Sequence, residues 1–275
     1  MSSDNPSNSE TNAEYKVSEL FDKTDGTIAF RSSDNMIFHI NPKYLEITTE
    51  GFPPSDFVST PSSEAVSLAE KSDVLELLFQ FTCPRVPPNL DGIGFSLVLE
   101  VAEAAEKYVV YNAITICTMR MKDFLPQEAL RVFQFAGEYD HENLIDIVAP
   151  LLVHKPFSDV AYSIPSKLHF AWSMYREQWL QTLYHISFWA TDVDLCHCYQ
   201  SRDHNSRWKR RVWEVQNQIA INPPDILKFR QLLDETTLGT CQGYTHWLDE
   251  VDAEIKQMRD FRSFLAEHRG KAKFY

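Results

Sequence analysis

The feature that most constrains the fold of this chain is a change in the spacing of its apolar residues near residue 70. Before that point, residues 27–30 and 36–40 are short apolar stretches that flank the polar sequence Arg31-Ser-Ser-Asp-Asn35, which suits a tight turn. Beyond it, apolar residues recur about every 3.6 positions, as they do along the buried face of a helix. The sequence therefore predicts a β-hairpin followed by a train of packed helices.

Shorter elements are predicted around these stretches. A helix is expected at 42–49, ended by Gly51, and a short strand at 66–69. The next helix is predicted to begin at Asp73, with Glu76 three positions later as in a capping box, and to be apolar on most sides like a central core helix. Three more helices are marked by apolar stripes, which comprise Leu97, Val98, Val101, Ala102, Ala105, Tyr108 and Val109, then Ala129, Phe133 and Ala136, then Leu144, Ile147, Val148 and Leu151.

The character of the chain changes after Lys155-Pro156, because all six tryptophans lie beyond this point. Four further helical segments are expected there, each marked by aromatic and aliphatic residues at helical spacing. These segments span about 168–186, 208–219, 225–233 and 247–264. The aromatic stripes are interpreted as core, so the sequence predicts an all-helical C-terminal extension.

Composition and charge limit the classes of function. With 44% hydrophobic and 13% aromatic residues in a chain of 275, a packed core is expected instead of wholesale disorder. The net charge is -13. An acidic surface repels phosphate backbones and argues against nucleic acid as the main ligand, although acidity also serves simply to keep a protein soluble.

The terminus and the cysteines bear on the compartment. Residues 1–15 are polar and are expected to form a disordered leader without the apolar core of a signal peptide, and no run approaches the length of a membrane span. The five cysteines are odd in number and sparse, which fits a reduced protein. We therefore expect an intracellular protein, cytoplasmic or nuclear, with no membrane contact.

The order strand, strand, helix, strand and then helices resembles that of the BTB/POZ domain, a protein-interaction module. The resemblance is closest to fungal BTB/POZ proteins that carry a helical C-terminal extension and no other named domain. The residues that carry it are Arg31-Ser-Ser-Asp34, Leu45-Glu46, Glu50-Gly51-Phe52-Pro53-Pro54, Val74-Leu75-Glu76-Leu77-Leu78, and the sequence 102–108, which looks like the Ala-x-x-Tyr hinge pair that joins two helices in this family. It implies an α+β domain at 16–155 after the leader, and an all-α extension at 156–275.

The resemblance also implies a function. A member of this family is expected to act as an adaptor or scaffold in protein–protein interactions, not as an enzyme, and to need no cofactor. Two uses are common in the family: oligomerisation, and docking onto a cullin scaffold to present substrates for ubiquitination. For the cullin use, the helices from Leu97 to Phe124 are the expected contact surface.

One departure from the family pattern bears on dimerisation. BTB domains commonly carry His and then Arg just before the first helix, and that Arg faces an Asp in the pocket of the homodimer interface. The aligned positions here are Asn41 and Pro42, although Asp25 remains as the acidic partner. A buried Asp without its cation is costly, so this pocket is either open to solvent or rearranged. The standard dimer is therefore in question, while self-association through another face stays open.

Two aromatic residues are candidates for partner binding. Phe52 and Phe57 flank the loop Pro53-Pro54-Ser-Asp, whose prolines stiffen the backbone and pre-organise it for a partner. The alternative is that both rings tuck under the loop and serve the core.

A basic segment at 202–211 supports a second hypothesis, a nucleic-acid or chromatin factor. Arg207, Arg210 and Arg211 surround Trp208, and cations interleaved with an aromatic are typical of nucleic-acid contacts or of a nuclear address. However, Trp208 also belongs to a helical apolar stripe. In that case the charges form a solvated helix face or pair with the acidic residues near Asp249.

A third hypothesis is a metal-dependent enzyme centred on Cys196, His197, Cys198 and His204. Thiolate and imidazole are the ligands that zinc prefers, but this spacing does not reproduce the usual Cys-x(2–4)-Cys knuckle. The alternative is a loop with ordinary thiols between two helices. The chain has no Gly-x-Ser-x-Gly elbow, no Walker-type phosphate loop and no strand followed by Gly-x-Gly-x-x-Gly. Because the Cys and His residues lack the spacing of a zinc knuckle, no metal site is predicted.

Overall fold

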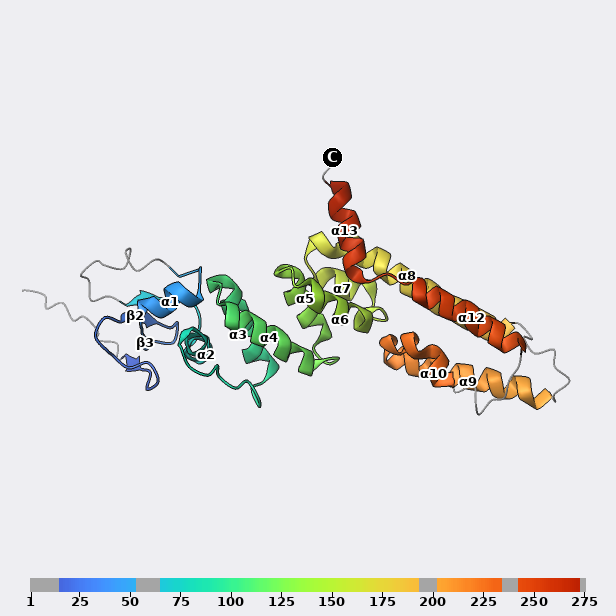
Figure 1. Cartoon of the computed structure of the whole chain (residues 1–275), viewed down its shortest axis with the longest axis horizontal. Coiled ribbons are helices and arrows are strands. Elements are labelled where there is room, and N and C mark those ends of the chain that lie inside the picture. Colours follow the sequence, from blue (N-terminus) through green and yellow to red (C-terminus); the bar gives the residue numbers. More distant parts are fainter. Residues whose placement is uncertain (1–14, 53–64, 193–201, 234–241, 273–275) are drawn as a thin grey trace, which may run out of the picture. The chain divides into compact units, whose positions relative to one another are not determined.

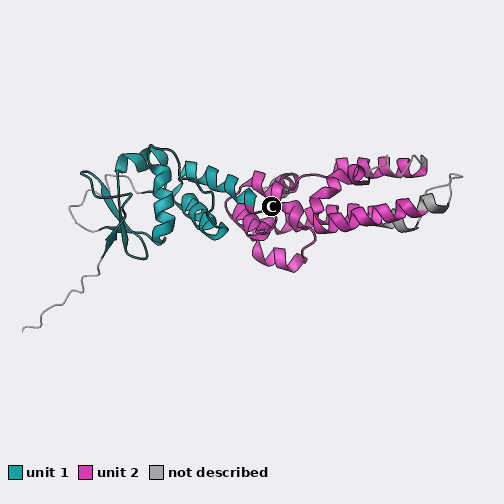
Figure 2. Cartoon of the chain, turned by 90° about the horizontal axis from the view of Figure 1, so that it is seen from below, with its two compact units in different colours: residues 1–123 teal, residues 124–275 magenta. Residues whose placement is uncertain are grey.

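A computed structural model of the chain describes residues 15–52, 65–192, 202–233 and 242–272 (Figure 1). The chain divides into two compact units, unit 1 at residues 1–123 and unit 2 at residues 124–275 (Figure 2). Unit 1 holds a small four-stranded sheet and several helices, whereas the described part of unit 2 contains helices only. The predicted α+β class is confirmed.

The sheet of unit 1 is built on the predicted hairpin. Its strands are β1 (Lys16–Val17), β2 (Ile28–Arg31), β3 (Met36–Ile40) and β4 (Val66–Ser67), in the spatial order β1-β3-β2-β4. Strands β2 and β3 are antiparallel, with Phe30 opposite Phe38, and Asn35 takes a left-handed conformation (φ 65°) in the turn between them. The short strands β1 and β4 pair in parallel at the two edges.

The described part of unit 1 also contains the helices α1 (Pro42–Thr48), α2 (Ser72–Thr82), α3 (Phe95–Tyr108) and α4 (Tyr111–Met121). Helix α3 ends at Tyr108 because Val109 turns the chain through a left-handed conformation (φ 53°). The order of strands and helices and the break at Tyr108 agree with the predictions.

Phenylalanine rings fill the core between the sheet and α2. The ring of Phe79 on α2 lies 5.4 Å from that of Phe30 and 5.6 Å from that of Phe38, centroid to centroid. Phe21 and Phe52 flank the same ring, each at 6.0 Å. Since α2 is buried on most sides, it is the central core helix that its apolar sequence predicts.

The predicted capping box of α2 is wrong. The helix begins at Ser72, and the Glu76 side chain instead accepts a hydrogen bond from Ser18 Oγ at 3.3 Å. The start of the helix is bound by Asp34 in the β2–β3 turn, whose carboxylate accepts hydrogen bonds from the backbone N–H (2.9 Å) and hydroxyl (2.6 Å) of Ser72. Burial acts to raise the pKa of Asp34, but hydrogen bonds from Ser32 and Ser72 outweigh it and lower the pKa.

The end of α3 is fastened by Glu70. Its carboxylate accepts hydrogen bonds from Tyr108 Oη at 2.8 Å and from Lys107 Nζ at 2.7 Å. Burial acts to raise the pKa of Glu70, but the hydrogen bonds from Lys107 and Tyr108 outweigh it and hold the pKa below its ordinary value of 4.5. The folded state therefore favours the ionised carboxylate.

This lowered pKa predicts a specific acid sensitivity. The stabilisation by ionised Glu70 is fully present above the unfolded-state pKa near 4.5, and is lost as the pH falls through the lower folded-state pKa. Urea unfolding at several values between pH 7 and pH 3 is expected to show a shallower loss of stability for Glu70→Gln than for the wild type. The control is Glu100→Gln. Because Glu100 is exposed, this variant is expected to lose stability with falling pH as steeply as the wild type does. Equal slopes for the wild type and Glu70→Gln would contradict the prediction.

The helices of unit 2 are mostly those that the sequence predicts. In the described residues they are α5 (Ala129–Glu138), α6 (Glu142–Leu152), α7 (Phe157–Ser163), α8 (His169–Asp192), α9 (Arg202–Ile221), α10 (Phe229–Leu233), α12 (Gln242–Gln257) and α13 (Phe261–Ala272), with 3-10 helices at Ser166–Leu168 and Pro223–Lys228 (η4). A further 3-10 helix, Lys122–Phe124, spans the boundary between the two units. Trp172, Trp208 and Trp247 are buried, which confirms that these aromatic residues serve the core.

The last predicted segment is two helices instead of one. Helix α12 runs along α8 and α13 also packs against α8, at a steep angle to it (Figure 1); the helical structure is interrupted between α12 and α13 at Arg259. The Gln178 side chain of α8 donates to the Arg259 carbonyl (3.1 Å) and accepts from the Arg259 backbone N–H (2.9 Å). Asp260 then accepts from the Ser263 backbone N–H at 3.0 Å and caps α13. These side chains replace the helical hydrogen bonds at the break.

The boundary between the compact units lies earlier than the predicted domain boundary at 155/156. Phe133 of α5 lies 5.5 Å from Trp172 and 5.6 Å from Phe261, centroid to centroid. Asp146 of α6 accepts a hydrogen bond from the Arg262 backbone N–H at 3.1 Å and pairs with its guanidinium. By packing, α5 and α6 therefore belong with the C-terminal helices, while the domains at 16–155 and 156–275 stay a prediction.

Candidate interaction surfaces

Phe52, a predicted partner-binding residue, lies in the core of unit 1. Its side chain is 9% exposed and stacks on Tyr108, with ring centroids 4.4 Å apart and an interplanar angle of 9°. This placement agrees with the alternative in which the ring tucks under the loop. The second candidate, Phe57, lies outside the described residues.

The residues that depart from the family pattern have a local role. Asn41 is the N-cap of α1, where its Oδ1 accepts a hydrogen bond from the Lys43 backbone N–H at 3.0 Å, and Pro42 occupies the first turn. Asn at the N-cap and Pro at the first helical position both favour helix initiation. Asp25 is exposed in the single chain, which fits the alternative of an open pocket.

The predicted basic segment lies on α9, with its cations on different sides of the helix. Trp208 is 1% exposed and stacks on Tyr244, with ring centroids 4.4 Å apart. Arg211 faces its own unit, since it donates to the Leu232 carbonyl at 2.6 Å and pairs with Glu214 at 3.0 Å. Arg207 and Arg210 are at exposed positions. The buried tryptophan is part of the core and does not lie among the cations on the surface.

The candidate metal ligands fall largely outside the described residues. Cys196, His197 and Cys198 are not described, and His204 belongs to α9 without a described side chain. Elsewhere in the described part of the chain, no group of three or more His, Cys, Asp or Glu side chains is placed to hold a metal ion. Cys117 is buried, and burial raises the pKa of its thiol to about 12, so this cysteine is protonated at neutral pH.

Helix α4 exposes two large apolar side chains within the region 97–124. Met119 is 63% exposed, and Tyr111 is exposed at the start of the same helix. Methionine adapts its conformation to a partner, and tyrosine is enriched among the residues that dominate binding energy at interfaces. Both side chains are therefore accessible from the surface of unit 1 and are not part of its core.

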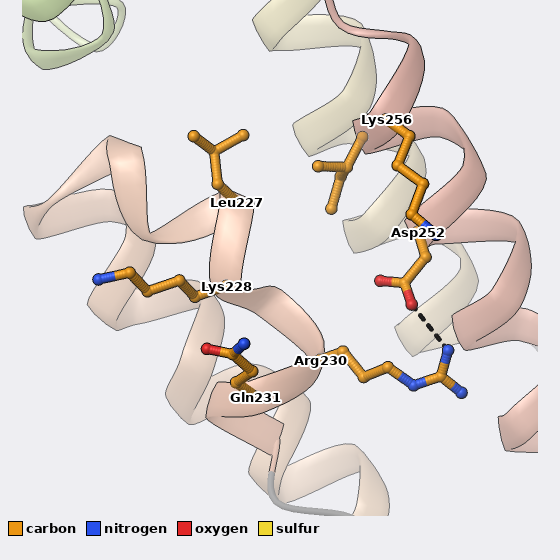
Figure 3. Close-up of a pocket in the computed structure, with 7 residues that line it drawn as sticks. Leu227, Lys228, Arg230, Gln231, Asp252 and Lys256 are labelled. Carbon is orange, nitrogen blue, oxygen red and sulfur yellow. Dashed lines mark hydrogen bonds and ion pairs between the residues drawn. The ribbon is translucent and has the colours of Figure 1, made fainter.

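A groove in unit 2 was not predicted from the sequence. It lies between η4 and α10 on one side and α12 on the other, and has a volume of about 440 Å³ (Figure 3). The residues that line it are Leu227, Lys228, Arg230, Gln231, Asp252, Ile255 and Lys256. The spacing of Asp252, Ile255 and Lys256 does place them on one helix face, but the sequence does not reveal which helix lies opposite.

Comparison with known proteins does not identify the chain. No protein-family model matches it, and no curated protein shows significant similarity to it in sequence. Across the described residues, no helix combines the length and apolar character that a membrane crossing needs.

Proposed function

We propose that this chain is an adaptor or scaffold for protein–protein interactions inside the cell, with a BTB/POZ-like module in its N-terminal part. The observation that carries the proposal is the order of elements in unit 1: a hairpin, a short helix, an edge strand, and then the helices α2, α3 and α4. This is the order on which the resemblance to the BTB/POZ domain rests.

The residues that carry the resemblance also have structural roles that support the proposal. Asp34 joins the hairpin turn to the start of α2, and Leu45 is buried in α1. Tyr108 ends α3, stacks on Phe52 and binds Glu70. The sequence features shared with the family therefore coincide with the contacts that hold these elements together.

The partner that we propose is a cullin scaffold of a ubiquitin ligase, with α3 and α4 as the contact surface. Helix α4 has the exposed apolar residues that such a contact requires, in Tyr111 and Met119. Unit 2 then serves to recruit the substrate. The standard BTB homodimer is not part of this proposal, because Asn41 and Pro42 replace the family's His-Arg pair.

Co-purification of the tagged full chain from its native cells tests this proposal. Mass spectrometry is expected to recover a cullin together with ubiquitin machinery. Met119→Asp places a charge in the proposed contact and is expected to reduce cullin recovery by about tenfold or more, since an unpaired charge buried in an interface is strongly unfavourable.

Val86→Asp is the matched control, because Val86 is also an exposed apolar residue of unit 1 but lies between α2 and α3. It is expected to leave cullin recovery unchanged. Recovery of the chain alone, or of partners without a cullin, would overturn the ligase-adaptor proposal.

A further inference from the structure

The groove between α10 and α12 has a floor held together by Arg230. Its Nη1 lies 2.8 Å from Asp249 Oδ1 and 2.7 Å from Asp252 Oδ2, so one guanidinium of α10 binds two carboxylates of α12. Figure 3 shows the contact with Asp252 between the two sides of the groove. A cation shared by two carboxylates orients the helices more firmly than an isolated surface pair does.

Apolar residues and cations line the groove together. Leu227 of η4 is 58% exposed, and Ile255 of α12 is partly exposed. Lys228 and Lys256 are exposed on the two sides, and neither ammonium group forms an ion pair with a residue that the structure describes. The groove thus combines apolar surface with two lysines that form no ion pair within the described part of the chain, in a protein whose net charge is -13.

We propose that this groove binds an acidic peptide segment of a partner protein, with an apolar side chain of the segment placed between Leu227 and Ile255. Acidic side chains of the segment pair with Lys228 and Lys256. The Gln231 amide, which both donates and accepts, pairs with the peptide backbone. This inference rests on the interaction role proposed above, and it specifies the chemistry of a partner for unit 2.

The geometry favours a peptide over other anions. A small-molecule site buries most of its ligand, whereas Leu227, Lys228 and Lys256 are exposed and leave this groove open. A nucleic-acid backbone offers phosphates to the lysines but no aliphatic side chain to Leu227 and Ile255, and the chain is acidic as a whole. A peptide can place its carboxylates on the lysines and an aliphatic side chain between Leu227 and Ile255.

The affinity is expected to be modest and to depend on salt. Exposed ion pairs each contribute little, so two of them together with one apolar contact predict a dissociation constant on the order of 10–100 µM. Because both lysines are exposed, raising the ionic strength is expected to weaken binding.

Fluorescence anisotropy with the full chain tests the proposal. The probe is a labelled peptide of about ten residues, with two leucines four positions apart among glutamates and aspartates. The double variant Lys228→Glu/Lys256→Glu is expected to weaken binding by about tenfold or more. Lys43→Glu/Lys155→Glu changes the net charge equally at exposed lysines outside the groove, and is expected to keep the wild-type affinity.

Three results would overturn the proposal: no binding of the peptide at 1 mM chain, equal affinity for both double variants, or tighter binding of a single-stranded DNA decamer that the groove variant alone abolishes. The last result assigns the groove to nucleic acid. Circular dichroism checks that each variant is folded. Cullin recovery with the wild type and Met119→Asp is measured separately, so a failed groove and a failed adaptor role are distinguished.

Discussion

Replacing Gly51 with alanine is expected to lower the unfolding free energy of unit 1 by about 3 kcal/mol. A β-carbon at this position would lie 2.5 Å from Tyr108 Cα and 2.7 Å from Tyr108 O, closer than non-bonded atoms approach. Both contacts are with backbone, which cannot rotate away as a side chain does. The Gly51 N–H also donates to the Tyr108 carbonyl at 2.9 Å, so moving the two segments apart breaks this hydrogen bond as well.

The control for this variant is Gly94→Ala. A β-carbon at Gly94 meets no atom within 4 Å, and its φ of -70° suits any residue. Because glycine is a better N-cap than alanine, we expect a cost of about 1 kcal/mol or less. Urea unfolding followed by far-UV circular dichroism measures both variants. Equal midpoints for Gly51→Ala and Gly94→Ala would contradict the close packing of α3 against the segment after α1.

How far the sequence predicts this fold depends on how far apart along the chain the interacting residues lie. Elements that depend on local spacing were predicted, such as the β2–β3 hairpin and the apolar face of α2. The start of α2 was not, because its acceptor, Asp34, is 38 positions away along the chain from Ser72. A capping box is a local pattern, and the Glu76 that would complete it binds Ser18, which follows β1.

The same distinction applies to unit 2 and its candidate surfaces. The apolar stripe of 247–264 is continuous in sequence, whereas the break between α12 and α13 involves Gln178, 81 positions from Arg259, as well as the local cap Asp260. The groove likewise depends on which face of α12 lies opposite α10. Phe52 is a further example, since a loop aromatic beside two prolines has no local feature to indicate that it stacks on Tyr108.

Replacing Trp208 with alanine is expected to lower the unfolding free energy of unit 2 by about 4 kcal/mol. The indole is 1% exposed and stacks on Tyr244 at 4.4 Å with an interplanar angle of 6°, and Tyr244 in turn contacts Trp247 edge-on at 6.4 Å. Truncation removes this stacking and leaves a cavity between α9 and α12. All six tryptophans lie in unit 2, so the urea transition of tryptophan fluorescence reports on this unit.

Trp213, five positions later on the same helix, is the matched control because it is 63% exposed. Trp213→Ala is expected to change the unfolding free energy by about 0.5 kcal/mol or less.

The two variants Trp208→Ala and Trp213→Ala also test the alternative that the basic segment binds nucleic acid. A ring as buried as Trp208 cannot stack on a base in the folded chain, whereas Trp213 is exposed on the helix that carries Arg207 and Arg210. Single-stranded DNA binding that Trp213→Ala abolishes, without loss of stability, would favour that alternative over a partner-binding role for α9. Equal destabilisation by Trp208→Ala and Trp213→Ala would contradict the packing of α9 described above.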